Sequence, residues 1–300
     1  MLGTGHINSQ SSNIVLFPTC VVWHGGEYFI VDNGNCRIVC TPSLLFPKYR
    51  VIYSDLIRPH TIRFVDLLTI IDDTDRHSIK VNVAGSGEWR EIRLNGLRPH
   101  HMEVSTATRQ LLVLCANSQT MHIFDVAGSN LVLAREIHLK FLNDCYTRSF
   151  QLDGDRIFFV PVGGRIIECL FDSKTGGADI KPVRQHAVPF SQTSGAFFYK
   201  VPRQERYYLG FVPKQYHDED GILVYSRSLQ FDEYRLLNKT LGVEGVPYSM
   251  TNIGGGIHLL CNIFKTSKIT ICTRFANHHI PWFSLRWRLP ESGWLFEGKF

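Results

Sequence analysis

The sequence of 300 residues lacks the features that mark a membrane, exported or multi-domain protein. No apolar run reaches the roughly 20 residues that a bilayer-spanning helix requires. Residues 1–17 carry no basic start followed by an apolar core and a cleavage site. No Ser/Gly tract, Pro-rich run or charge block is typical of a linker. These absences predict one domain over residues 1–300, with no membrane partner and a cytoplasmic location.

The sequence also has little that builds helices or disulfide frameworks. No stretch sustains an apolar period of about 3.6 residues, so helices should be few. The eight cysteines are scattered, mostly inside apolar strand-like runs, which predicts buried thiols in a reducing compartment. Cys36 and Cys40 form the only close pair, and no second pair follows to complete a metal site. We therefore interpret both as buried or edge thiols.

Motifs of nucleophilic and phosphate-binding enzymes are missing as well. No Ser, His, Asp order with an elbow motif occurs. The run 254–256 is all glycine, but it follows no strand-to-helix pattern and is interpreted as a turn. The net charge of +5 is dispersed along the chain, so it permits an anionic ligand or nucleic acid without requiring either.

A repeated phrase is the strongest positive signal in the sequence. Residues 58–60 read Arg-Pro-His, and residues 98–100, about forty positions later, read the same. A unit repeated at this period cannot bury its apolar face alone and stacks against copies of itself. The chain should therefore be an array of similar units.

Each unit contains four short runs rich in β-branched and aromatic residues, separated by Gly and Asn turns. This is the content of one propeller blade. Six such units fill the chain, with starts near residues 18, 59, 99, 147, 193 and 247. The fold class predicted is all-β, a six-bladed β-propeller of four-stranded antiparallel blades. The outer strand of the last blade is expected from the C-terminal tail at 282–289, with 13–16 as the alternative closing strand.

Residues 29–39, which read Phe-Ile-Val-Asp-Asn-Gly-Asn-Cys-Arg-Ile-Val, resemble the second and third strands of an NHL repeat. Residues 72–79 are a weaker copy. The resemblance covers the first two units well, the third in part, and the rest only by strand layout. NHL-type six-bladed propellers include modules that bind RNA or protein, and enzymes such as the peptidyl-hydroxyglycine lyases. Membership alone therefore implies no single function.

The first residues of the innermost strands should point into one mouth of the central channel. Aligning the units predicts a polar ring at that mouth, made of Thr19, His60, His100, Arg148, Ser194 and Tyr248. Convergent polar groups in a concave site are the usual candidates for binding or catalysis.

Two interpretations of the histidines stay open at this point. In the peptidyl-hydroxyglycine lyases, three histidines in Pro-His pairs hold zinc, and His60 and His100 match two of those pairs. The resemblance predicts that they bind a divalent metal, zinc or similar, but no third Pro-His pair occurs. The alternative is an inherited turn in which each histidine bonds to a neighbouring blade. His101 should face away, because side chains alternate along a strand.

The other ring members suggest further roles. Arg148 suits a carboxylate or phosphate. Tyr248 can serve as an acid or base if a metal or Arg148 lowers its pKa. Thr19, Arg148 and Ser194 are the predicted substrate-binding residues, with Arg148 and Tyr248 catalytic. Five residues before His60, His100 and Arg148, the sequence repeats an oxygen-bearing side chain that can complete or orient a site. These residues are Asp55, Asn95 and Asn143.

Two functions from different classes follow from this ring. The first is an enzyme that binds a small polar or anionic substrate at the channel mouth, as a metal-dependent lyase, epimerase or hydrolase. The second is an NHL-type module that binds RNA or protein without catalysis, which requires exposed aromatic side chains on a basic face.

Overall fold

The computed structural model describes residues 15–45, 47–142, 145–171, 179–188, 194–200, 206–212, 221–236, 246–254, 257–263, 268–275 and 278–286. Nearly all regular structure in this part of the chain is β-strand. The strands form six four-stranded sheets, each made of consecutive strands paired antiparallel. The first strands of the sheets lie within three residues of the predicted unit starts.

The first two sheets comprise β1 (Pro18–His24), β2 (Glu27–Asp32), β3 (Arg37–Thr41) and β4 (Arg50–Tyr53), then β5 (Ile62–Val65), β6 (Leu68–Asp73), β7 (Ser78–Val83) and β8 (Trp89–Arg93). The next two comprise β9 (Pro99–Ser105), β10 (Gln110–Cys115), β11 (Thr120–Ala127) and β12 (Asn130–His138), then β13 (Thr147–Asp153), β14 (Arg156–Pro161), β15 (Arg165–Phe171) and β16 (Ile180–Ala187). The last two comprise β17 (Ser194–Lys200), β18 (Arg206–Val212), β19 (Gly221–Ser226) and β20 (Phe231–Leu236), then β21 (Val246–Gly254), β22 (Ile257–Ile263), β23 (Lys268–Phe275) and β24 (His278–Arg286).

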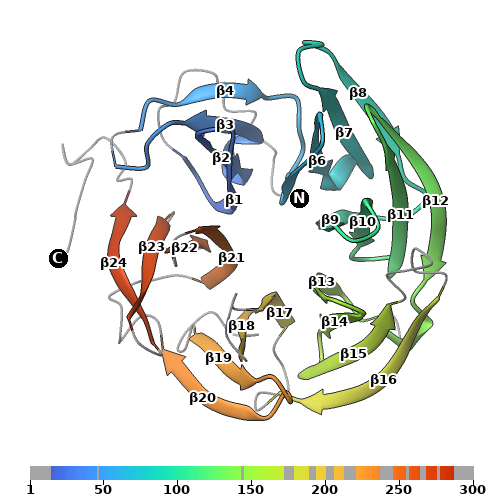
Figure 1. Cartoon of the computed structure of the whole chain (residues 1–300), viewed down its shortest axis with the longest axis vertical. Coiled ribbons are helices and arrows are strands. Elements are labelled where there is room, and N and C mark those ends of the chain that lie inside the picture. The colour runs from blue at the N-terminus through green and yellow to red at the C-terminus, as the bar shows by residue number, and fades with distance from the viewer. Residues whose placement is uncertain are drawn as a thin grey trace, which may run out of the picture.

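The sheets stand around a common centre, with the first strand of each innermost and the fourth outermost (Figure 1). The predicted all-β propeller with four-stranded antiparallel blades is therefore confirmed. β24 lies next to β23 and completes the last sheet, so the outer strand comes from the C-terminal side as predicted. The helices of the described residues are short 3-10 turns at 33–35, 74–76 and 140–142, and none is long and apolar enough to span a bilayer.

In the third blade, burial falls from the second strand to the outermost strand and follows the sequence pattern. Every residue of β10 is buried, whereas most of β12 is exposed. The second strand has blades on both sides, which explains why its sequence is a continuous apolar run instead of an alternating one. Side chains on its two faces enter different interfaces. Leu111 and Val113 pack against β6 and β7, while Leu112 and Leu114 pack against β14 and β15.

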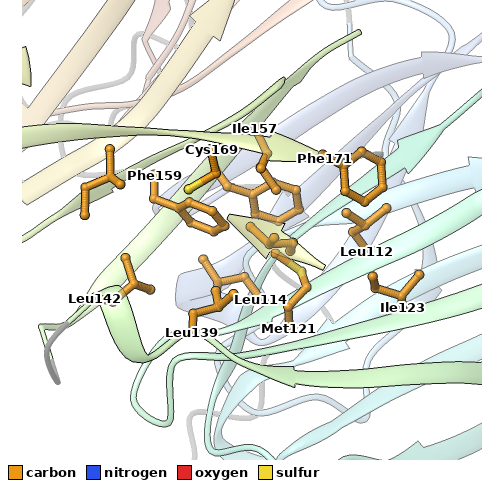
Figure 2. Packing of buried hydrophobic residues seen from close by; sticks show 13 residues of the cluster. Leu112, Leu114, Met121, Ile123, Leu139, Leu142, Ile157, Phe159, Cys169 and Phe171 are labelled. Atoms are coloured by element: carbon orange, nitrogen blue, oxygen red, sulfur yellow. The ribbon is translucent and has the colours of Figure 1, made fainter. Parts of the chain in front are cut away.

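The interface between the third and fourth blades shows how the apolar surface is used. Leu114 and Met121 of one blade meet Phe159, Cys169 and Phe171 of the next in a cluster without charged side chains (Figure 2). Equivalent clusters join each neighbouring pair of blades, including the first and last, where Val21 and Ile30 pack with Leu259 and Cys261. The ring is thus closed by apolar packing, which leaves the polar side chains of the inner strands for the channel.

We predict that Leu114→Ala lowers the free energy of unfolding by about 2 to 5 kcal/mol, because truncation leaves a cavity between two blades. The control is Leu170→Ala, which removes the same atoms from a side chain that is 51% exposed and should cost at most about 1 kcal/mol. Urea unfolding of the two variants and the wild type measures both changes. Equal losses would contradict the role assigned to this interface.

Candidate functional site

A cavity of about 270 Å³ lies among the innermost strands. Residues from β1, β5, β9, β13, β17 and β21, or from the turns just before them, line it. Five of the six predicted ring residues are among them: Thr19, His60, His100, Arg148 and Tyr248. The structure therefore brings together, at one cavity wall, residues that are as far as 229 positions apart in the printed sequence.

β-Bulges explain why these side chains reach the cavity. In β1, Pro18 pairs with Asp32 and Cys20 with Val31, so Thr19 is an extra residue. His100 in β9 and Tyr248 in β21 are extra residues in the same way. Arg148 lies in the irregular stretch of β13 between its paired residues 147 and 150. A bulge rotates the local backbone and re-aims a side chain, which here turns it toward the channel.

The same bulge overturns the expectation that His101 faces away. Leu114 pairs with His101 and Cys115 pairs with Pro99, so strict alternation is broken at His100. As a result His101 lines the cavity together with His100. Alternation of side chains holds only along a regular strand, and the sequence carries no direct sign of the bulge.

The imidazole of His60 is held by a chain of hydrogen bonds that ends on a buried carboxylate. Its Nδ1 lies 2.8 Å from Thr74 Oγ1, which in turn lies 2.7 Å from Asp72 Oδ2 and 2.7 Å from the Pro99 carbonyl. Both of the latter atoms are acceptors, so the single hydroxyl proton is given to one of them. Thr74 Oγ1 must then accept from His60 Nδ1–H. In this tautomer Nε2 carries a lone pair and no hydrogen. It makes no hydrogen bond within the described residues.

Asp72 also fixes the backbone that carries His60. The backbone N–H of His60 donates to Asp72 Oδ1 at 3.0 Å, and Thr61 donates to the same oxygen through its N–H and, at 3.0 Å, through its hydroxyl. Asp72 is fully buried, whereas the His60 side chain remains 11% exposed. The histidine is thus held firmly while part of its ring stays accessible.

His100 stacks on His60, with ring centres 3.9 Å apart and planes 26° apart. Its Nδ1 lies 3.0 Å from the Arg148 carbonyl, an acceptor, so Nδ1 carries the proton. The Tyr248 hydroxyl lies 3.2 Å from His100 Nε2 and donates to it. Both nitrogens of His100 are therefore engaged, one by a neighbouring blade and one by Tyr248.

Burial sets the protonation of this pair. Burial holds the pKa of His100 well below its usual value, and the positive charge of Arg148 acts in the same direction. Burial raises the pKa of Tyr248 well above its usual value, although the charge of Arg148 acts in the opposite direction. Arg148 alone therefore does not lower the pKa of Tyr248 below its usual value, which was one condition for a role as acid or base. Tyr248 keeps its proton and acts as a hydrogen-bond donor.

Arg148 brings positive charge to the same wall. Its guanidinium carbon lies 4.9 Å from the centre of the Tyr146 ring, a cation–π contact that orients the side chain. Its backbone carbonyl accepts the hydrogen bond from His100 Nδ1. Arg148 therefore supplies a positive charge and also fixes the orientation of the His100 ring. An anionic group placed beside it would also lie close to the stacked histidines.

A charged group that was missed in the sequence lies further along the inner strands. Arg63 Nη2 lies 2.9 Å from Glu103 Oε1, and His101 Nε2 lies 3.0 Å from that same oxygen. All three residues line the cavity. Arg63 and Glu103 stand three positions after His60 and His100, so each blade supplies one histidine and one partner of the ion pair. The sequence did contain a signal for this ion pair, because the two residues have opposite charges and stand one repeat apart.

Other predicted site residues lie elsewhere. Asp55 accepts a hydrogen bond from Arg76 at 2.6 Å, and Asn95 donates to Glu136 at 3.0 Å, so neither completes the cavity. Asn143 falls outside the described residues, as does the side chain of Ser194. The register of β17 places its extra residue at position 196, two positions after Ser194.

The histidines as they lie do not fit a shared zinc ion. A metal binds in the plane of an imidazole ring along a nitrogen lone pair, whereas these two rings stack face to face, and His100 Nε2 already accepts from Tyr248. Within the described part of the chain, no group of three or more His, Cys, Asp or Glu side chains is arranged to hold a metal ion. A divalent metal at His60 and His100 stays a prediction.

A comparison with protein-family models and curated proteins finds no match. Solved structures do match. A putative 6-phosphogluconolactonase from Bacteroides uniformis is 12% identical over 90% of this chain and 85% of its own, with a TM-score of 0.65. The periplasmic gluconolactonase PpgL of Pseudomonas aeruginosa is 12% identical over 89% and 85%, with a TM-score of 0.62. A streptogramin B lyase is 11% identical over 83% and 92%, with a TM-score of 0.54.

The fold of this chain is a β-propeller. At these sequence identities the similarity establishes the fold alone. The chemistry has to be inferred from the residues of the site. The propellers that it resembles include a putative 6-phosphogluconolactonase, a gluconolactonase and a lyase.

We predict that His100→Gln makes stability less sensitive to acid. Above about pH 6.5 His100 is neutral in both the folded and the unfolded state; below it only the unfolded chain binds the proton. The free energy of unfolding should therefore fall by up to about 1.4 kcal/mol per pH unit from this residue alone. Gln keeps one donor and one acceptor but cannot titrate. Urea unfolding from about pH 7.5 to 5 measures the slope.

The control for this measurement is His138→Gln, at an exposed position of β12. It should leave the slope of the wild type unchanged. If His100→Gln shows that same slope, His100 does not resist protonation in the folded state.

Proposed function

We propose that this chain is a six-bladed, NHL-type propeller enzyme that takes a small polar or anionic substrate into the channel cavity. His60 is the general base, Arg148 anchors the anionic group, and Tyr248 donates a hydrogen bond to His100 and holds it neutral. The single observation that carries the proposal is the His60 side chain at the cavity, whose Nε2 makes no hydrogen bond within the described residues and whose Nδ1 is fixed through Thr74 to the buried Asp72.

This arrangement suits proton transfer. A general base needs an imidazole of defined tautomer within reach of the substrate, and a carboxylate behind it to stabilise the positive charge that forms. Asp72 is fully buried, with its Oδ2 3.8 Å from His60 Nδ1. His100 stays neutral beside it and adds no repulsion when His60 takes a proton. Lyase, epimerase and hydrolase reactions all begin with such a transfer, from a carbon or from water.

The solved structures that resemble the chain support a test on cyclic esters and sugar acids. In hydrolysis, His60 Nε2 takes a proton from water as the oxygen bonds to the ester carbon. The ester C–O bond then breaks, and the leaving oxygen receives that proton. In epimerisation or elimination, the proton comes from a substrate carbon.

We predict that the wild type hydrolyses D-gluconolactone or exchanges the carbon-bound hydrogen of D-gluconate with solvent, and that His60→Gln lowers the rate by about 10²- to 10⁴-fold. Acid release in a pH-stat measures hydrolysis, and deuterium incorporation followed by NMR measures exchange. His138→Gln, on the outer surface, is the matched control and should keep full activity. A wild type that does neither and is stabilised only by single-stranded RNA would favour the binding module.

Metal dependence is a separate part of this proposal. If His60 and His100 hold zinc, the purified protein should contain about one zinc per chain, because structural ligands bind metal tightly at neutral pH. His60→Ala and His100→Ala should each lose the metal while the protein remains folded. Elemental analysis paired with thermal melts measures both. A metal-free wild type that remains active would show that no metal is needed.

A further inference from the structure

The two oxygens of the Glu103 carboxylate differ in their hydrogen bonds. Oε1 accepts from both Arg63 and His101, at 2.9 and 3.0 Å. Among the described residues, no group donates to Oε2. The Glu103 side chain is 26% exposed and lines the cavity, so a ligand in the channel can approach this carboxylate.

We propose that Glu103 binds a hydroxyl group of the substrate, and that the substrate is therefore a polyhydroxylated acid. This inference rests on the function proposed above and assigns the substrate class. Arg148 holds the acid group near His60, and Glu103, one blade before Arg148 and further along the channel, accepts from a hydroxyl on the other part of the molecule.

A hydroxyl fits this oxygen better than an ammonium group. The Arg63 guanidinium lies 2.9 Å from Glu103 and already neutralises its charge, so a substrate cation would meet an arginine at close range. A hydroxyl donates the same hydrogen bond without that repulsion. Thr251, which also lines the cavity, offers a further donor and acceptor to a ligand with several hydroxyls.

Glu103 remains an acceptor throughout the physiological pH range. Burial would raise its pKa, but the Arg63 charge and the hydrogen bond from His101 hold it at about 2. Two donors on one oxygen also fix the orientation of the carboxylate. An acceptor that is both ionised and fixed in place gains more from a substrate hydroxyl than a mobile surface carboxylate would.

The first experiment uses the wild type alone and compares three probes. D-gluconate is a carboxylic acid with hydroxyls along its carbon chain, hexanoate has the same chain and acid without the hydroxyls, and sorbitol has the hydroxyls without the acid. We expect gluconate to bind at least about tenfold more tightly than hexanoate, because a site with a fixed polar acceptor discriminates against a ligand that leaves it unpaired. Sorbitol should bind more weakly than gluconate. Calorimetric titration measures the three affinities.

The second experiment compares Glu103→Gln with Glu91→Gln as the control. Glu91 does not line the cavity, and its Oε2 lies 2.6 Å from Lys80 Nζ. Glu103→Gln should reduce the preference for gluconate over hexanoate by about tenfold, since the charged acceptor is replaced by a neutral amide. Glu91→Gln should keep the preference of the wild type. Arg148→Lys should weaken both acids alike, because the planar two-pronged donor is lost.

The outcomes separate this inference from the proposed function. If Arg148→Lys weakens both acids but the wild type does not prefer gluconate, or Glu103→Gln keeps that preference, the role of Glu103 is overturned and the anionic substrate stands. If neither acid binds the wild type, both proposals fail. The comparison of probes in the wild type remains decisive even if Glu103→Gln does not fold.

Discussion

The hydrogen bonds that join one blade to the next at the inner strands are the contacts on which the site depends. Asn33 Nδ2 donates to the Pro59 carbonyl at 2.7 Å, Thr74 Oγ1 lies 2.7 Å from that of Pro99, and His100 Nδ1 donates to that of Arg148 at 3.0 Å. Each bond fixes the start of an inner strand from the blade before it. The apolar clusters between the blades supply stability, whereas these polar contacts set the positions at the channel.

The same contacts determine the chemistry that the histidines can perform. A histidine whose Nδ1 donates to a fixed acceptor has its tautomer and ring orientation defined, and its Nε2 is left for another partner. In His100 that partner is Tyr248, while His60 keeps its Nε2 for the cavity. A structural role and a catalytic role are therefore compatible at these positions. The bond to a neighbouring blade that one interpretation expected is made by His100, whereas Nδ1 of His60 bonds to Thr74 of its own blade.

Repetition accounts for what could be predicted from the sequence. Residues one repeat apart occupy the same position in adjacent blades, so His60 and His100 were expected to meet, and their rings stack. The same reasoning applied to charge would have found Arg63 and Glu103, which are also one repeat apart. The bulges could not be predicted in this way, because an extra residue in a strand depends on pairing with its neighbour. His101 was placed on the wrong side for that reason.

The ion pair of Arg63 and Glu103 bears on whether the channel is inert. A largely buried ion pair costs desolvation that its attraction roughly repays, and apolar side chains of similar volume often serve stability as well or better. The blade interfaces follow that rule with Leu, Ile, Val and Phe. In the channel, Glu103 instead lines the cavity with an ionised carboxylate whose Oε2 receives no hydrogen bond within the described residues. A charge held in this way stabilises the complex with a ligand more than it stabilises the protein, which favours a binding site over a structural ring.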